Sequence, residues 1–203
     1  MNKKIIFITG GARSGKSSFA MAEASKVNGK KAYVASAEAL DEEMGERIEN
    51  HKRQRGEEWI TYEEPEKISD VIKKIEREYS VIVIDCLTLW LSNIMHSGLE
   101  IADAINTLID VLNENNPPSP PFSKGGLGGL SGEIESERTG ASHALTLYIV
   151  SNEVGMGIVP DNEIARRFRD MAGILNQKVA EVSDEVYMVV AGIPVKIKDK
   201  GET

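Results

Sequence analysis

The chain has 203 residues, of which 32 are Asp or Glu and 24 are Lys or Arg, so its formal net charge is −8. This length is typical of one domain, and the acidity excludes a general electrostatic attraction to nucleic acid or to anionic lipid. The single cysteine, Cys86, excludes an internal disulfide and a cysteine-rich zinc site and is typical of the reducing cytoplasm, and no apolar run approaches the ~20 residues of a membrane span.

Short apolar runs rich in β-branched residues alternate with amphipathic stretches. Nearly unbroken apolar runs are typical of strands buried on both faces of a parallel sheet. The predicted strands are 5–9, 32–35, 81–84, 145–150 and 186–190, and the predicted helices are 16–27, 41–55, 65–78, 87–95, 101–113 and 162–181. This alternation predicts an α/β fold with one domain over residues 1–203, a mostly parallel sheet flanked by helices, and an antiparallel edge near 186–198.

The first predicted strand leads directly into a phosphate-binding loop motif. The motif G-x-x-x-x-G-K-[ST] is matched by Gly10, Gly11, Ala12, Arg13, Ser14, Gly15, Lys16 and Ser17. In such a loop the backbone N–H groups surround phosphate oxygens, the lysine adds positive charge at the β- and γ-phosphates, and the hydroxyl is offered to Mg²⁺. The motif predicts a nucleoside triphosphate site with Lys16 as a catalytic residue and Ser17 at the metal, but it does not identify the reaction.

The predicted helix 41–55 contains a histidine with two competing interpretations. His51 shares one helix face with Met44 and Ile48, which favours a structural histidine on a buried stripe. Three of the next four residues are basic, which suits a polyphosphate better than a core. Nearby cations also favour a neutral imidazole, as a nucleophile must be.

Asp85 follows the predicted strand 81–84 at the carboxyl end of the sheet. An acid at this position of a phosphate-loop protein holds Mg²⁺ directly or through water, and ligands bind at this edge of such sheets. The alternative is an N-cap for the next helix. Because the guanine-specificity motif N-K-x-D is absent, the remaining classes are small-molecule kinases, ATPases and nucleotidyltransferases.

Residues 115–142 interrupt the alternation with a segment that contains four of the seven prolines and six of the 18 glycines. Such a composition buries too little apolar area to offset the entropy of ordering the chain. We interpret it as a low-complexity, disordered surface insertion within the domain. The alternative, a proline-rich ligand for a partner protein, is disfavoured because the glycines weaken a rigid polyproline helix.

Several longer segments together resemble one enzyme family. They are the phosphate loop, 44–55 with its R-I-x-x-H core, 85–93 (DCLTLWLSN), 150–160 (VSNEVGMGIVP), 166–177 (RRFRDMAGILNQ) and 192–196 (GIPVK). With them the chain resembles the bifunctional adenosylcobinamide kinase / adenosylcobinamide-phosphate guanylyltransferase family of cobalamin biosynthesis. The likeness covers nearly the whole chain except the insertion.

The resemblance implies two reactions with ATP or GTP and a corrinoid, adenosylcobinamide, as substrates and Mg²⁺ as cofactor. A nucleoside triphosphate phosphorylates the corrinoid, and GMP from GTP then passes through a histidine, His51 here, to give adenosylcobinamide-GDP. The nucleotide contacts that the resemblance implies are the phosphate loop, Ser36, Ala37, Glu38, Lys52, Arg53, Gln54, Arg55, Glu63 and Asp85. It also implies a RecA-like sheet and a homo-oligomer, a trimer.

Some assignments stay open on the residues alone. The segment 152–157 is either a wall of the substrate site or a structural turn, and the arginines at 166, 167 and 169 either reach a phosphate or form a solvated face, which is the usual role of a charge run. The rival functions are a phosphate-loop kinase in which His51 is structural and a nucleotide-binding regulatory protein without corrinoid turnover.

Overall fold

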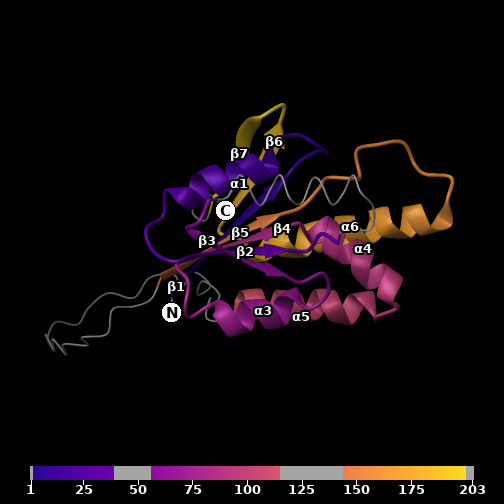
Figure 1. The fold of residues 1–203 in the computed structure, drawn as a ribbon. Helices are drawn as coiled ribbons and strands as arrows, with labels where there is room; N and C mark the ends of the chain where they lie inside the picture. Colours follow the sequence, from indigo (N-terminus) through magenta and orange to yellow (C-terminus); the bar gives the residue numbers. More distant parts are fainter. Residues whose placement is uncertain (1, 39–55, 115–143, 200–203) are drawn as a thin grey trace, which may run out of the picture.

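The computed structural model describes residues 2–38, 56–114 and 144–199. They form a seven-stranded sheet in the order β3-β2-β4-β5-β1-β6-β7 (Figure 1). The strands are β1 (Asn2–Thr9), β2 (Lys31–Ala35), β3 (Trp59–Glu63), β4 (Val81–Asp85), β5 (Ala144–Val150), β6 (Glu185–Val190) and β7 (Ile193–Asp199). Every neighbouring pair is parallel except β6 and β7, which form an antiparallel hairpin at one edge.

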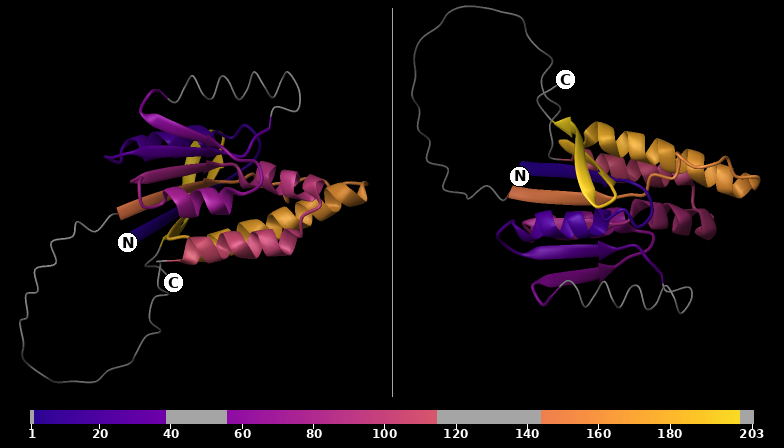
Figure 2. Two further views of the ribbon diagram at one scale, coloured as in Figure 1. Left: turned by 60° about the horizontal axis from the view of Figure 1, so that its bottom comes forward. Right: turned by 90° about the horizontal axis from the view of Figure 1, so that it is seen from above.

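Helices cover the two faces of the sheet unequally (Figures 1 and 2). The described helices are α1 (Lys16–Ser25), α3 (Ile68–Ile75), α4 (Leu87–Ser97), α5 (Ile101–Asn113) and α6 (Glu163–Val182). Helix α1 packs on one face, and the other four pack together on the opposite face. No helix in these described ranges is long and apolar enough to cross a membrane.

Strand β1 shows why the predicted strands read as continuous apolar runs. Ile5 and Phe7 join the core beneath α3, α4, α5 and α6, whereas Ile6 and Ile8 pack toward α1. Successive side chains of a strand point to opposite faces, so a strand covered on both faces needs apolar residues at every position. Burial of each such side chain is worth roughly 1.5–3 kcal/mol, which makes the centre of the sheet a rigid support for the loops at its edge.

The helices that follow the two central strands lie on opposite faces of the sheet. β1 is followed by α1 on one face, and the neighbouring β5 is followed by α6 on the other. The loops that leave their carboxyl ends therefore lead to opposite faces of the sheet. In open α/β sheets, ligands bind outside the carboxyl ends of the strands at this kind of reversal.

The predicted fold class is confirmed, including the antiparallel edge. Strand β3 was missed, because this edge strand is partly exposed and its five residues form no continuous apolar run. The helix predicted over 65–78 is shorter and spans Ile68–Ile75. The predicted helix 41–55 and the predicted insertion 115–142 lie outside the described residues. The division of the chain into a domain and an insertion therefore stays a prediction.

Candidate active site

The phosphate loop joins β1 to α1 and adopts a conformation that needs its glycines. Gly10 has φ 149° and Gly15, the N-cap of α1, has φ 97°. A Cβ atom at Gly10 would lie 2.3 Å from the Val189 carbonyl oxygen, so no other residue fits there. The backbone of this loop is thus free to turn its N–H groups toward an anion at the start of α1.

Lys16 is the buried cation of the loop. Its side chain is almost fully covered, and its Nζ donates a hydrogen bond of 2.6 Å to the Gly11 carbonyl oxygen. Burial lowers the pKa of Lys16, and the nearby Cys86 and Asp85 oppose that shift. Lys16 begins the helix that follows β1 and Asp85 ends β4, so both lie at the carboxyl edge of the sheet, although they are 69 positions apart in the sequence.

Two other segments brace the loop through backbone hydrogen bonds. The Gly192 N–H, at the tip of the β6–β7 hairpin, donates to the Ser14 carbonyl oxygen at 2.9 Å. On the other side, the Glu153 N–H donates to the Gly10 carbonyl oxygen, also at 2.9 Å. The shape of the phosphate loop therefore depends on segments that follow it by more than a hundred residues.

Asp85 ends β4 at the same edge of the sheet. In the register it pairs with Ala35 on one side and Val150 on the other. The hydroxyl of Tyr33 donates a 2.7 Å hydrogen bond to its Oδ2 atom. Tyr33 is buried, and sequence reasoning assigned it no role because a tyrosine within an apolar strand reads as core. Tyr33 orients the carboxylate of Asp85, which is predicted to lie on the metal side of the site.

Ser36, predicted to contact the nucleotide, is fully buried. Its Oγ accepts a hydrogen bond from the Cys86 N–H at 2.9 Å and donates one to the Cys86 carbonyl oxygen at 2.7 Å. The side-chain amide of Asn93 donates to the Ser36 carbonyl oxygen at 2.8 Å. The hydroxyl of Ser36 thus fixes the turn that follows Asp85, and Asn93 is a second supporting residue that sequence reasoning missed.

The other predicted nucleotide contacts divide into two groups. Ala37 is half-buried and Glu38 is exposed just beyond β2, and the exposed Glu63 ends the neighbouring β3, opposite Ala35. The structure therefore gathers these residues, the phosphate loop and Asp85 along one edge of the sheet. The remaining predicted residues, His51, Lys52, Arg53, Gln54 and Arg55, lie outside the described residues.

The donor set suits Mg²⁺ better than a metal held by the protein alone. Within residues 2–38, 56–114 and 144–199, no group of three or more His, Cys, Asp or Glu side chains could hold a metal ion. Mg²⁺ is commonly held by one or two protein oxygen ligands together with substrate phosphates. The partly exposed Asp85 carboxylate and Ser17 hydroxyl fit that pattern.

The fold and the site define a nucleotide-binding protein of the phosphate-loop class. Among solved structures, the chain is similar to a prototypical ATPase from the type III secretion system of pathogenic bacteria, with a TM-score of 0.53 and 10% identity. The likeness covers 95% of this chain and 56% of that one, so the chain spans about half the length of the ATPase. At this identity the likeness concerns the fold alone.

The family model described as cobinamide kinase / cobinamide phosphate guanyltransferase matches residues 6–119 and 132–197, and the chain belongs to this family. The break in the match falls within the segment predicted to be an insertion. Relatives named bifunctional adenosylcobalamin biosynthesis protein CobU, from Escherichia coli K12 and Salmonella typhimurium LT2, are each 35% identical over 96% of this chain and 99% of their own length. The protein CobP from Pseudomonas aeruginosa, with the same descriptive name, is 35% identical over 94% of this chain and 95% of its own.

Proposed function

We propose that the protein phosphorylates adenosylcobinamide with ATP or GTP and then transfers GMP from GTP to the product, which gives adenosylcobinamide-GDP. The family supports both activities. The observation that carries the proposal is that Lys16 and Asp85 both lie at the carboxyl edge of the sheet, where backbone hydrogen bonds fix the phosphate loop from both sides. We also propose that the protein acts in the cytoplasm.

In the kinase step, the acceptor hydroxyl oxygen bonds to the γ-phosphorus and the bond to the β,γ-bridging oxygen breaks. The nucleoside diphosphate leaves, and the hydroxyl proton passes to solvent. Catalysis of this transfer is mainly positioning and charge stabilisation. The loop N–H groups and the Lys16 ammonium hold the phosphates, while Ser17 and Asp85 would hold Mg²⁺, which neutralises charge that develops on the phosphate oxygens.

In the guanylyl step, an imidazole nitrogen of His51 attacks the α-phosphorus of GTP and pyrophosphate leaves. A phosphate oxygen of the phosphorylated corrinoid then displaces the histidine. A covalent intermediate divides one difficult transfer into two easier ones. The roles of His51 and of Lys52, Arg53, Gln54 and Arg55 rest on the resemblance, and those of Ser36, Ala37, Glu38 and Glu63 on the resemblance and their place at the edge of the sheet.

We further propose that the protein assembles with copies of itself, as a trimer by resemblance. The β6–β7 hairpin supports this, since its apolar side chains Val190, Ile193, Val195 and Ile197 are 48–66% exposed. Exposed apolar residues gathered on one element mark interaction surfaces. Sedimentation of the Ile193→Asp/Val195→Asp variant should show a smaller species than the wild-type protein. An unchanged wild-type trimer in this variant would exclude the hairpin as the contact.

The test of the function is to incubate the protein with Mg²⁺ and GTP labelled at the α- or the γ-phosphate and then to denature it. Acid-labile α-label should remain on the protein, and His51→Ala should abolish it. The matched control is His96→Ala, because His96 is an exposed histidine at the end of α4. Bound nucleotide without protein label would favour a kinase without a histidine intermediate. The next measurement would then be corrinoid-dependent transfer of the γ-label.

A further inference from the structure

The segment between β5 and α6 carries the most exposed large apolar side chains in the described part of the chain. Met156 is 75% exposed, Ile158 97% and Val159 58%, and Ile164, in the first turn of α6, is 70% exposed. Figure 1 shows this segment, in orange, extending away from the sheet before α6 begins. We refer to these four side chains as the apolar platform.

The start of this segment is anchored from three directions. The Asn152 N–H donates to Thr88 Oγ1 at 2.9 Å, and the Asn176 side chain donates to the Asn152 carbonyl oxygen at 3.1 Å. The next residue, Glu153, donates its N–H to the Gly10 carbonyl oxygen of the phosphate loop. The root of the segment is therefore joined to α4, to α6 and to the phosphate loop itself.

Its return to α6 is anchored as well. One guanidinium nitrogen of Arg166 donates to the carbonyl oxygens of Pro160 and Asp161, at 3.0 and 2.6 Å. The side chain of Asn162 caps α6 by accepting hydrogen bonds from the N–H groups of Ile164 and Ala165. The exposed apolar side chains thus belong to a segment fixed at both ends, which indicates a preformed surface rather than a frayed loop.

The strand order places the root of this segment between the phosphate loop and Asp85. β5 lies between β1, which carries the phosphate loop, and β4, which carries Asp85. A group held between Lys16 and Asp85 therefore faces the segment that leaves β5. The β6–β7 hairpin lies on the other side of β1, away from Asp85.

The platform also lies within reach of the phosphate loop. Because Glu153 is hydrogen-bonded to Gly10, Met156 is only three residues from the phosphate loop and Ile158 five. At ~3.3–3.6 Å per residue of fully extended chain, these residues lie within roughly 10–18 Å of Glu153, whose N–H is hydrogen-bonded to Gly10. A large acceptor whose hydroxyl group reaches the γ-phosphate must extend over this distance.

We propose that the apolar platform binds the corrin ring of the cobinamide substrate, an inference that rests on the proposed function. A corrin ring is a broad, methyl-substituted, mainly apolar disc with carboxamide side chains at its rim, so it requires an apolar support. The alkylated Co(III) complex is also a cation. The exposed carboxylates of Asp161 and Glu163 border the platform, form no ion pair with a described residue, and would attract that charge.

The test compares corrinoid and nucleotide binding by the full-length protein. In Met156→Ser/Ile158→Ser, equilibrium dialysis should show at least a tenfold rise in the Kd for adenosylcobinamide, equal to about 1.4 kcal/mol. The KM for adenosylcobinamide should rise equally, while the Kd for GTP should change less than twofold. Met156→Leu/Ile158→Leu should retain wild-type binding. The matched control is Ile60→Ser, because Ile60 is 53% exposed on β3 but lies away from the carboxyl edge.

Three results would overturn this assignment. The first is wild-type corrinoid affinity in the serine variant. The second is a smaller sedimenting species with unchanged corrinoid affinity, which would make the platform a contact between copies of the chain. The third is an equal loss of GTP affinity, which would mean that the segment acts only through the phosphate loop. A wild-type protein that binds GTP and no corrinoid would instead refute the proposed function, and the platform assignment with it.

Discussion

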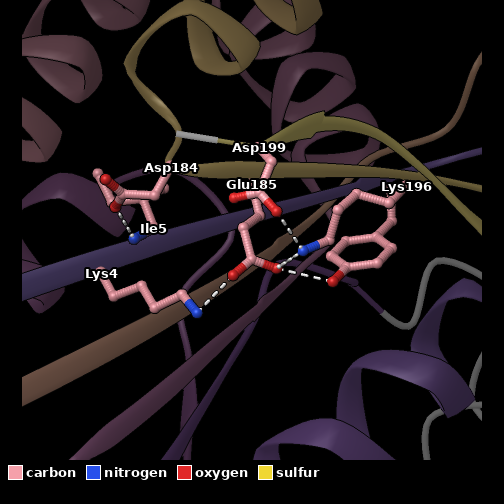
Figure 3. Close-up of polar contacts among 7 residues, drawn as sticks. Lys4, Ile5, Asp184, Glu185, Lys196 and Asp199 are labelled. Carbon is pink, nitrogen blue, oxygen red and sulfur yellow. Dashed lines mark hydrogen bonds and ion pairs between the residues drawn. The ribbon is translucent and has the colours of Figure 1, made fainter. Parts of the chain in front are cut away.

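Asp85 and Glu185 are two carboxylates of the same sheet that each accept a tyrosine hydroxyl at 2.7 Å, from Tyr33 and Tyr187. Their other surroundings differ. Glu185 lies near the start of the hairpin and also pairs with Lys4 and Lys196 (Figure 3). Asp85 lies at the carboxyl end of β4 and forms no ion pair with any lysine or arginine in the described ranges.

The contacts of Glu185 form a closed structural cluster. Lys196 bridges Glu185 and Asp199, each at 3.0 Å, and lies 5.3 Å from the centre of the Tyr187 ring (Figure 3). Although burial opposes it, the hydrogen bonds from Lys4, Tyr187 and Lys196 lower the pKa of Glu185 to about 2. These contacts tie β1, β6 and β7 together and leave the carboxylate little capacity for a ligand.

The different surroundings of Asp85 and Glu185 indicate different roles for the two carboxylates. A carboxylate whose partners are all protein groups stabilises the fold. A carboxylate that is oriented by one neutral donor keeps most of its lone pairs for a metal ion or a ligand. On this comparison we propose Asp85 as the functional carboxylate and Glu185 as the structural one, and substitutions should separate the two roles.

The largest expected effect is on catalysis in Asp85→Asn. This change removes a negative charge but little volume, so the kinase rate should fall by roughly 10²–10³-fold, the range for loss of one group that stabilises transition-state charge. Thermal unfolding should stay near that of the wild-type protein. Steady-state kinetics and calorimetry measure the two effects. A variant with normal turnover would exclude Asp85 from the metal side of the site.

A smaller loss of kinase activity is expected in Tyr33→Phe, which removes the hydroxyl that orients Asp85. Loss of such a supporting hydrogen bond typically costs ~10–100-fold in metal affinity or activity. We expect the Mg²⁺ concentration for half-maximal rate to rise by about tenfold, with GTP binding in the absence of Mg²⁺ unchanged.

The matched control for Tyr33→Phe is Tyr79→Phe. Tyr79 is also buried, and its hydroxyl lies 2.9 Å from that of Tyr62, but it precedes β4 at the opposite edge of the sheet. Its loss should leave the Mg²⁺ dependence of the rate unchanged. An equal shift in both variants would attribute the effect to general loosening of the core rather than to Asp85.

The sequence predicted the parts of this site that depend on local pattern. The phosphate loop is predicted directly by its glycines and lysine. The acid after a buried strand was predicted as a metal ligand or an N-cap, and in the structure Cys86, not Asp85, is the N-cap of α4. Tyr33 and Ser36 could not be assigned in this way. Their roles depend on strand order, which places β2 beside β4 and brings Tyr33 and Ser36 to the Asp85–Cys86 turn.

The same dependence on strand order explains why the sequence could not assign a role to the segment after β5. Its glycines left a substrate wall and a structural turn equally open, because nothing in the pattern shows that β5 lies between the phosphate loop and Asp85. The structure shows that order, together with the exposure of Met156 and Ile158. Arg166, predicted either to reach a phosphate or to lie on a solvated face, donates to the carbonyl oxygens at the end of the segment. The pattern of charged residues in the sequence does not predict this contact with main-chain groups.

For the structural carboxylate, Glu185→Gln should lower the free energy of unfolding by about 1–2 kcal/mol while kinase and guanylyl activities stay near wild type. The value is small because Lys4 and Lys196 are partly exposed, so water screens both ion pairs. Urea denaturation measures the change. A loss of activity with unchanged stability would reverse the roles assigned to the two carboxylates.

The pH dependence of stability provides a second test of the structural role of Glu185. The pKa of Glu185 lies below its ordinary value of 4.5, at about 2 in the folded protein, so its stabilisation is complete above about 4.5 and is lost as the pH falls toward 2. Glu185→Gln lacks this titration. The difference in unfolding free energy between wild type and variant should therefore be constant from pH 7 to about 5 and should shrink as the pH falls from about 4.5 to about 2. A difference that does not change with pH across this window would mean that shape, and not charge, makes Glu185 stabilising.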